Sequence, residues 1–344
     1  MYRERVAAYV ASEVGKAKSS KEAALNGVGA AVGMMGDLFR DFQAIFDMGL
    51  QANPETPPSA MTYTERKYLD LYDMVKIMAP WIVDEIVQRG PKGTLAVARE
   101  LDFGRSGVRS VDLHGIKRAI LTWDHFDPPI LPEAKSVRGF NHSMCGFLLC
   151  PVTHDWDDTE VRKGLQNRSR KFPAGPKDYA RVLWRDEKVN KDNLNDGFLM
   201  NRRLTQAGRY SLLGPGASAG VPSKIPTRKP KAKIHRIRSI TTGFVAYTAV
   251  LVHFSLSSQE SFGDGTTPGT FQYEAFYQSL VRYMEETMSE DERNELLIWW
   301  TIQMFGAVDE SGDEEDTDRP SVMAQMKKQA AQRRGAASSE SPTQ

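Results

Sequence analysis

A run of 21 residues without a charged side chain, residues 239–259, constrains the fold of this chain more than any other feature. A run of that length could span a bilayer, and the basic residues before it resemble the flank of a membrane span. However, nine Ser, Thr, His and Gln residues dilute it, and only Phe244 to Phe254 is strongly apolar, which is too short to cross a membrane. The run therefore predicts a helix buried at the centre of a globular domain. A buried strand is the alternative, because the run contains β-branched valines.

Two further helices are predicted towards the end of the chain. Residues 273–288 repeat apolar side chains every three or four positions, which is typical of an amphipathic helix. Ser289 and Glu292 have the spacing of a capping box, in which each side chain bonds the backbone of the other residue, so a second helix begins here. We expect Gly306 to end that helix, because glycine readily adopts the conformation that terminates helices.

Helical periodicity also covers the first half of the chain. Residues 64–88 show it, and Pro80 is expected to divide this helix because proline removes one of the helical hydrogen bonds. Ser110 is typical of an N-cap and predicts a new helix, which carries Leu113 to Trp123 on one face. A short helix is expected at residues 196–208.

The N-terminal segment carries an apolar stripe with three- and four-residue steps, as in one amphipathic helix or a coiled-coil seam. The residues of the stripe are Leu25, Val28, Val32, Met35, Phe39, Phe42 and Phe46. Such a stripe must be buried, so self-association through residues 25–46 is one expectation. Gly27, Gly29 and Gly33 lie within it, and we interpret them as points of close helix contact, because no strand precedes them to form a dinucleotide-binding turn.

These patterns predict a mainly α-helical protein, with a multi-helix globular domain and long loops over residues 62–306. An amphipathic helical segment, residues 1–50, precedes this domain across a proline-rich linker, residues 51–61. Residues 307–344 form the last part, and seven of the ten residues from Asp309 to Asp318 are acidic. A segment of this composition buries too little apolar surface to fold, so a disordered tail is expected.

Charge and cysteine content exclude several classes of protein. The 344 residues carry a net charge of +1 and include two cysteines, so the chain is no disulfide-stapled secreted scaffold. The first residues lack the apolar stretch of a secretory signal, and we expect neither a membrane partner nor a cofactor. Without residues 309–344, 40 basic side chains remain against 36 acidic ones, so the part expected to fold is mildly basic.

Several sequence blocks resemble, in the same order, an uncharacterised domain family found in mushroom-forming fungi. The first block is Gly139-Phe140-Asn141-His142, followed by Gly146, Leu148-Leu149-Cys150-Pro151 and Asp155-Trp156. The second block comprises Ile234-His235, Thr241, Ala246-Tyr247, Phe254 and Leu256-Ser257-Ser258. A leading helix is matched by Leu113, Lys117, Ala119-Ile120 and Trp123, and a closing helix by Leu296-Leu297-Ile298-Trp299-Trp300 with Phe305.

The resemblance extends over roughly residues 65–306. It implies no activity, cofactor or catalytic residue, because the family has no known function. The chain departs from the family pattern at Cys145 and His154, which are additional, and at residues 180–185, where a Gly-Asp-x-Trp-Pro run is usual. A site built on Cys145 or His154 would therefore not be a property of the family.

One cluster has the residue types of a metal or nucleophile site. Its members are His142, Cys145, Cys150 and His154. Two thiolates and two imidazoles could complete a tetrahedral zinc shell, although their order differs from that of ordinary zinc motifs. Alternatively, Cys150 could be the nucleophile of a hydrolase or transferase, with His142 as its base and Asp155 orienting the base. We favour neither site, because cysteine is often buried in cores and Pro151 lacks a backbone N–H for an oxyanion hole.

The strongest charge feature is a basic run around Pro226 and Pro230, which is either a solvated loop or an interaction site. Its residues are Lys224, Arg228, Lys229, Lys231, Lys233, Arg236 and Arg238. A basic run of this kind can be recognised by the nuclear import machinery or can contact phosphates. A second basic group, residues 162–171, is a candidate extension of the same surface. The sequence therefore favours a non-enzymatic nuclear interaction domain that associates with nucleic acid, chromatin or nuclear proteins, with a cytoplasmic location as the alternative.

Overall fold

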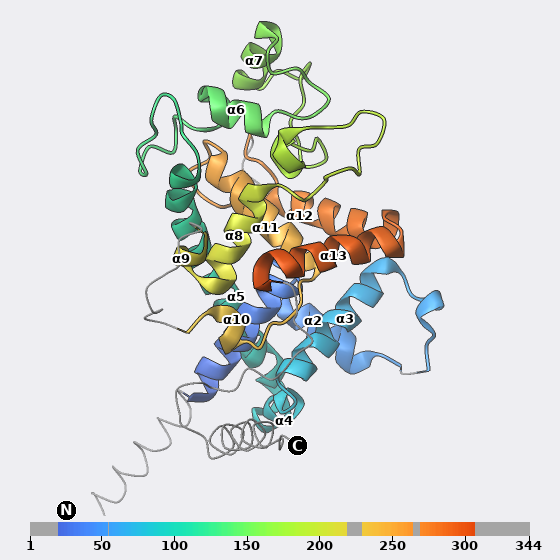
Figure 1. Ribbon diagram of the computed structural model, residues 1–344. Coiled ribbons are helices and arrows are strands. Elements are labelled where there is room, and N and C mark those ends of the chain that lie inside the picture. The colour runs from blue at the N-terminus through green and yellow to red at the C-terminus, as the bar shows by residue number, and fades with distance from the viewer. Residues whose placement is uncertain (1–19, 54, 219–228, 264–268, 307–344) are drawn as a thin grey trace, which may run out of the picture. The chain divides into compact units, whose positions relative to one another are not determined.

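The computed structural model describes residues 20–53, 55–218, 229–263 and 269–306. The chain divides into two compact units, residues 1–306 and residues 307–344, and the second lies wholly outside the described residues. The tail predicted to be disordered therefore lies outside them as well. The described part of the first unit is mainly α-helical, as predicted, and has two isolated β-bridges in place of a sheet (Figure 1).

Helix α11, Thr242–Leu256, forms the centre of the fold, and all of its residues are buried. It packs against α5 (Gly93–Trp123), α8 (Arg202–Leu213) and α12 (Tyr273–Arg282). Because neighbours cover it on all sides, this helix is apolar all round. The charge-free run thus forms the predicted buried helix and not the alternative strand. No helix in the described ranges is both long enough and apolar enough to cross a membrane.

Helix α5 has 31 residues and is about 46 Å long. The prediction that Ser110 begins a new helix is wrong, because α5 runs through this position without a break. Val108 before Ser110 and Leu113 after it are both buried. Packing of both halves of α5 therefore outweighs the local preference of serine for a helix cap.

The apolar stripe of residues 25–46 lies on two helices, where the periodicity predicted one. The first helix covers residues 20–35, and α2 spans Phe42–Gln51. Between them, the carboxylate of Asp37 accepts hydrogen bonds from the backbone N–H groups two and three residues later, at 2.8 and 2.9 Å. Aspartate competes in this way with helical hydrogen bonds, so the chain turns before α2 begins.

The side chains of this stripe are already covered within the single chain. Leu25, Val32, Phe42 and Phe46 are fully buried, in a cluster that also contains residues of α5 and of α3 (Tyr63–Met78). Self-association through residues 25–46 stays a prediction, and it would require this cluster to open.

Glycines allow the helix of residues 20–35 to cross α5 with the two backbones in contact. A Cβ atom added to Gly29 would overlap the carbonyl oxygen of Leu101, and one added to Gly104 would overlap the carbonyl oxygen of Asn26. Each glycine thus faces the backbone of the other helix. The interpretation of Gly29 as a point of close helix contact is confirmed.

Several helix ends lie where local sequence signals predicted them. Helix α3 ends at Met78, and α4, Ile82–Gln88, begins beyond Pro80. After α12 the chain makes a π-helical turn, Tyr283–Thr287, and then forms α13, Glu290–Phe305. Both hydrogen bonds of the capping box before α13 are present, and Gly306 ends this helix with a φ of 84°.

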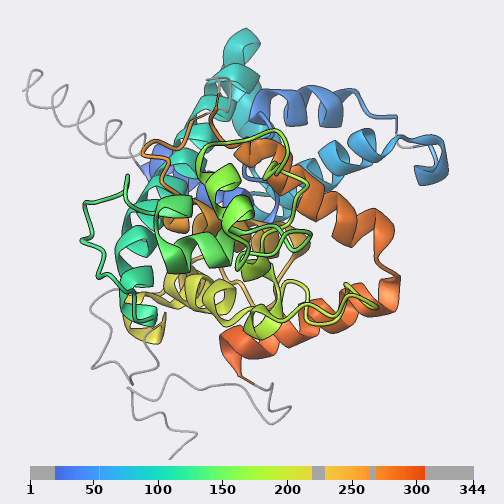
Figure 2. The ribbon, with the colours of Figure 1, turned by 90° about the horizontal axis from the view of Figure 1, so that it is seen from above.

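Short helices joined by long loops fill the segment between α5 and α11. They are α6 (Ser143–Leu149), α7 (Thr159–Gln166), α9 (Pro215–Ser218) and α10 (Lys231–Ile234), besides α8. This segment also contains short 3₁₀ turns at Gly139–Asn141, Arg181–Leu183 and Arg185–Glu187. Two further 3₁₀ turns, Pro58–Ala60 and Gly90–Lys92, come before α5. Helix α8 is the helix expected at residues 196–208, but it begins at Arg202, because Asn201 caps it. Helices α6 and α7 lie at the top in Figure 1 and nearest the viewer in Figure 2, over the helical core.

Candidate functional site

His142 holds the loop before α6 and uses both ring nitrogens for this purpose. Its Nδ1 accepts hydrogen bonds from the backbone N–H groups of Met144 and Cys145, at 3.2 and 3.4 Å, as the N-cap of α6. Its Nε2 donates to the carbonyl oxygen of Pro128 at 2.8 Å, because a carbonyl can only accept. As a general base or metal ligand, His142 would have to break this cap.

The two cysteines are structural residues in separate hydrophobic clusters. Cys145 is buried in the main core, and Cys150 packs in a small cluster with Trp156 and Val161. Burial raises the pKa of each thiol to about 11. Both thiols are therefore protonated at neutral pH, whereas a nucleophile or a zinc ligand must be a thiolate.

His154, the last member of the predicted cluster, and Asp155, the predicted orienting group, face different partners. The Nε2 atom of His154 lies 3.1 Å from the carbonyl oxygen of Pro173, and Asp155 accepts a hydrogen bond from the backbone of Asp157 at 2.9 Å. Within the described ranges, no three His, Cys, Asp or Glu side chains are grouped so that they could hold a metal ion. Closeness in sequence thus assembles neither the zinc shell nor a Cys150–His142–Asp155 triad.

The basic run is mostly exposed where the structure describes it. Lys224 and Arg228 lie outside the described residues. The exposed cations are Lys229, Lys233, Arg236 and Arg238, and none of them forms an ion pair with a described residue. We call residues 229–238 the basic segment.

Lys231, within the basic segment, has a structural role. Its Nζ atom lies 2.5 Å from Oδ1 of Asp112 on α5. Asp112 is only 1% exposed. The hydroxyl of Tyr247 on α11 donates to the other carboxylate oxygen at 2.9 Å. A buried carboxylate is costly unless it is paired, so the charge of Lys231 is committed to holding α10 against α5.

The expectation that residues 162–171 extend the basic segment is wrong. Figure 1 shows α7, which carries part of this group, at the opposite end of the unit from α10. Within the group, Lys171 pairs with Glu160 at 2.6 Å. Two of its arginines, Arg168 and Arg170, instead line a cavity.

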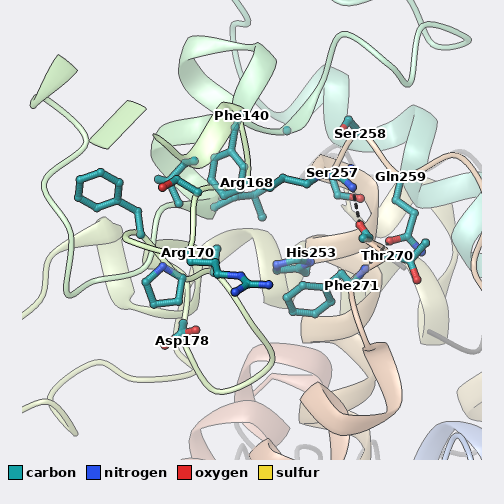
Figure 3. A pocket seen from close by; sticks show the side chains of 18 of the residues that line it. Phe140, Arg168, Arg170, Asp178, His253, Ser257, Ser258, Gln259, Thr270 and Phe271 are labelled. Atoms are coloured by element: carbon teal, nitrogen blue, oxygen red, sulfur yellow. Dashed lines mark hydrogen bonds between the residues drawn. The ribbon is translucent and has the colours of Figure 1, made fainter. Parts of the chain in front are cut away.

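This cavity has a volume of about 570 Å³, in the range of small-molecule sites (Figure 3). Its walls are formed by residues 139–140, by the loop 168–174 after α7, and by residues 257–261 and 269–271 after α11. Gly139 and Phe140 belong to the first block of the family resemblance, and Ser257 and Ser258 to the second. Residues of the two blocks that lie more than 100 positions apart in the sequence thus meet at one cavity.

Buried cations hold the end of α11 that forms the floor of the cavity. Lys135 donates to the carbonyl oxygens of Phe254 and Ser257, and Arg138 donates to that of Ser255 at 2.7 Å. Lys135 is 5% exposed and Arg138 fully buried. Burial lowers the pKa of Lys135 to about 7, so this amine is only partly protonated at neutral pH. The hydrogen bonds of both side chains, and the charge of Arg138 at the negative end of the helix dipole, hold the floor of the cavity in position.

His253 lies at the bottom of the cavity and is 8% exposed. Its ring stacks on Phe271 with 4.2 Å between the ring centroids, and Nδ1 lies 3.3 Å from the hydroxyl of Tyr273. Among the described residues, only Nδ1 of this ring has a hydrogen-bond partner, and Nε2 has none. Burial lowers the pKa of His253 to about 3, and the charge of Lys135 acts in the same direction. The imidazole is therefore neutral at physiological pH.

Acid is expected to destabilise the fold through His253. An unfolded chain binds a proton on this histidine below pH 6.5, whereas the folded chain does not, so stability is lost as the pH falls from about 6.5 towards 3. Between pH 6.5 and 5 the unfolding free energy should fall by up to about 1.4 kcal/mol per pH unit on this account. Denaturant unfolding of wild type and His253→Asn measures the difference.

The exposed residue His125 provides the control, because the variant His125→Asn should retain the full pH dependence of the wild type. Equal slopes for wild type and His253→Asn would contradict the argument.

No sequence pattern predicts this cavity. In the sequence, His253 is one of the polar residues that dilute a possible membrane span. The available signal was its position, because a lone imidazole near the end of a fully buried helix needs a specific environment.

The described residues define a mainly α-helical protein with a cavity of ligand size and an exposed basic segment. The model of a family of unknown function, DUF6698, matches residues 103–305. This match covers more than half of the chain, and the chain belongs to that family. The resemblance to an uncharacterised domain is thereby confirmed, although the matched part begins later than residue 65. No curated protein and no solved structure matches the chain.

Proposed function

We propose that this chain is a non-enzymatic nuclear interaction domain that binds the phosphates of nucleic acid through the basic segment. The observation that carries the proposal is the set of four exposed cations within ten residues, none of them paired with an acid in the described ranges. Surface cations with no acid beside them create a positive potential, and a polyanion is the partner that such a potential attracts.

The segment is also anchored, which reduces the entropy lost on binding. Lys231 pairs with Asp112 and Ala232 is 6% exposed, whereas Lys233 and Lys229 on either side are exposed. Arg236 has a φ of 55°, so the chain turns sharply between Lys233 and Arg238. An anchored segment presents its charges with less ordering than a free tail would need.

The same features set the expected mode of binding. Contacts to phosphates carry no sequence information, so binding should be non-specific and should weaken steeply with salt. Both ring nitrogens of His142 are occupied by hydrogen bonds, and the pKa of the Cys150 thiol is raised. These two observations support the non-enzymatic part of the proposal.

Replacing the four exposed cations of the basic segment with glutamine is expected to remove most of the salt dependence of binding to duplex DNA. The variant combines K229Q, K233Q, R236Q and R238Q. Each phosphate contact contributes about 0.9 to the slope of log K against log salt concentration, so the slope should fall by about 3 to 4. Fluorescence anisotropy with a labelled duplex at several salt concentrations measures it.

The matched control removes four exposed lysines elsewhere and has the same net charge. It combines K92Q, K163Q, K177Q and K191Q. This control should keep the wild-type slope, because the proposal depends on where the charges lie. Equal losses in both variants, or a wild type that does not bind DNA, would contradict the proposal, as would a fluorescent fusion that stays in the cytoplasm.

A further inference from the structure

We propose that the cavity beside His253 binds a small organic anion in which a flat aromatic ring carries one carboxylate or phosphate group. This site is separate from the basic segment. The basic segment precedes the first residue of α11, Thr242, and the cavity lies beyond His253 near the other end. A 15-residue helix separates its ends by about 22 Å, so one nucleic-acid phosphate cannot contact both sites.

The apolar part of the cavity suits a flat ring. Phe140, Phe172 and Phe271 line it from three different segments of the chain. Phe271 is held in place, because its ring stacks on His253 and its backbone N–H donates to the Gln259 side chain at 2.9 Å. An aromatic ring in such a pocket gains contact area and loses little conformational freedom, since the walls are already ordered.

The charge that faces the ligand is positive. Arg170 forms no ion pair with a described residue, and Figure 3 shows its guanidinium directed towards His253 and Phe271. Arg168 is partly committed, because it donates to the carbonyl oxygen of Gly269 at 2.7 Å. A guanidinium with free donors beside an apolar wall binds carboxylate or phosphate with two hydrogen bonds.

The acidic groups of the lining do not cancel this charge at the centre of the cavity. The carboxylate of Asp178 accepts the backbone N–H of Gly175 at 2.8 Å, and Figure 3 shows Asp178 at the edge, away from His253. Glu260 is exposed to solvent, as are Arg168 and Arg170, but it is the Arg170 guanidinium that Figure 3 shows directed inward, towards His253. The anion is therefore expected beside Arg170 and not beside either acid.

His253 supplies a neutral hydrogen-bonding group at the bottom of the cavity. Its Nε2 atom is unpartnered among the described residues although the side chain is more than nine-tenths buried. Nε2 opens into the cavity, where it is accessible to a hydrogen-bonding atom of a ligand. Because the ring is neutral, it adds no charge, so Arg170 should determine the preference for an anion.

Binding of four matched probes to the full chain tests the proposal. The probes are 2-naphthoate, 2-naphthyl phosphate, 2-naphthalenemethanol and inorganic phosphate, each measured by isothermal titration calorimetry. We expect the first two to bind and the neutral ring to bind at least about 10-fold more weakly, because it lacks the charge-assisted hydrogen bonds. Inorganic phosphate alone should show no measurable binding. The ratio between the first two probes identifies the anionic group.

Two variants and a control locate the binding. Arg170→Gln should weaken both anionic probes by about 10- to 100-fold and leave the neutral ring unchanged. Phe271→Leu should weaken all three aromatic probes. Arg99→Gln makes the same chemical change on an exposed part of α5 and should have no effect.

Several results would overturn the inference. They are no binding of either anionic probe at millimolar concentration, equal binding by the neutral ring, inorganic phosphate binding as tightly as naphthyl phosphate, or an unchanged affinity in Arg170→Gln. Thermal unfolding of each variant shows whether it is folded, and Arg170→Lys tests the charge separately from the shape of the guanidinium. None of these outcomes bears on DNA binding by the basic segment, so the two proposals fail independently.

Discussion

Replacing Gly104 with alanine is expected to lower the free energy of unfolding by about 2 to 3 kcal/mol, whereas the same replacement at Gly107 should raise it by up to about 1 kcal/mol. Both glycines lie on α5, one turn apart. A Cβ at Gly104 would overlap the carbonyl oxygen of Asn26, and a Cβ at Gly107 would meet nothing within 4 Å.

The two replacements differ in sign because a stabilising effect of alanine competes with a steric cost. Alanine restricts the unfolded chain and favours the helix, which stabilises the fold wherever the methyl group has room. At Gly104 the obstacle is backbone, which cannot rotate away as a side chain can, so α5 and the helix of residues 20–35 must separate. That separation also opens the cluster around Leu25 and Leu101.

Urea unfolding monitored by tryptophan fluorescence measures both values. Gly29→Ala approaches the same crossing from the other helix, where the obstacle is the carbonyl oxygen of Leu101, and should resemble Gly104→Ala. If Gly104→Ala and Gly107→Ala had equal effects, the crossing would not depend on backbone contact.

Removing the charge of Lys231 is expected to destabilise the fold by about 3 kcal/mol, in contrast to the same change at Lys233. Lys231→Met leaves the buried carboxylate of Asp112 without its cation, while the hydrogen bond from the Tyr247 hydroxyl is kept. Breaking a buried ion pair is costly because one charge stays in a medium of low polarity without compensation. Lys233 lies in the same short helix and is exposed, so Lys233→Met should change stability by less than about 0.5 kcal/mol.

A double variant separates loss of the pair from loss of packing. Combining Asp112→Asn with Lys231→Met removes both charges, so it should be more stable than Lys231→Met alone. The two single variants, Lys231→Met and Lys233→Met, should also differ in DNA binding. Lys233→Met should reduce the slope of log K against log salt concentration, and Lys231→Met should not. Equal stability of the two single variants would show that the ion pair contributes nothing to the fold.

Local signals were sufficient for a large part of the fold. The capping box at Ser289 and Glu292, the break at Pro80 and the terminating Gly306 act through hydrogen bonds and backbone conformations within a few residues, so neighbouring sequence contains all the information. The central helix was also predictable, because 21 residues without a charge can be accommodated only where other elements exclude water.

Local signals failed where distant packing competes with them. Ser110 has the preference of a cap, but α5 continues because residues on both sides of it are buried by other elements. The stripe of residues 25–46 has one continuous period, yet Asp37 and its backbone hydrogen bonds divide it. At Ser110 the competing energy comes from distant packing. At Asp37 it comes from local side-chain hydrogen bonds, which the hydrophobic period does not include.

The candidate site residues likewise could not be predicted from their spacing in the sequence. His142, Cys145, Cys150 and His154 are close in the sequence, but where the fold brings them into contact it does so through backbone groups, and their side chains form no shared site. The cavity, in contrast, assembles Phe140, Arg170, His253 and Phe271 from segments that no spacing rule connects.

The sequence by itself determined that the chain is helical, which segment is buried at its centre, where several helices begin and end, and where its basic residues are concentrated. These properties depend on hydrogen bonds, conformational preferences and hydrophobicity that act over one or two helical turns. Only the tertiary structure decided which cations are exposed, which histidine faces a cavity and which thiols are buried. Solvent exclusion and charge pairing depend on residues that are distant in the chain and become neighbours only when it folds.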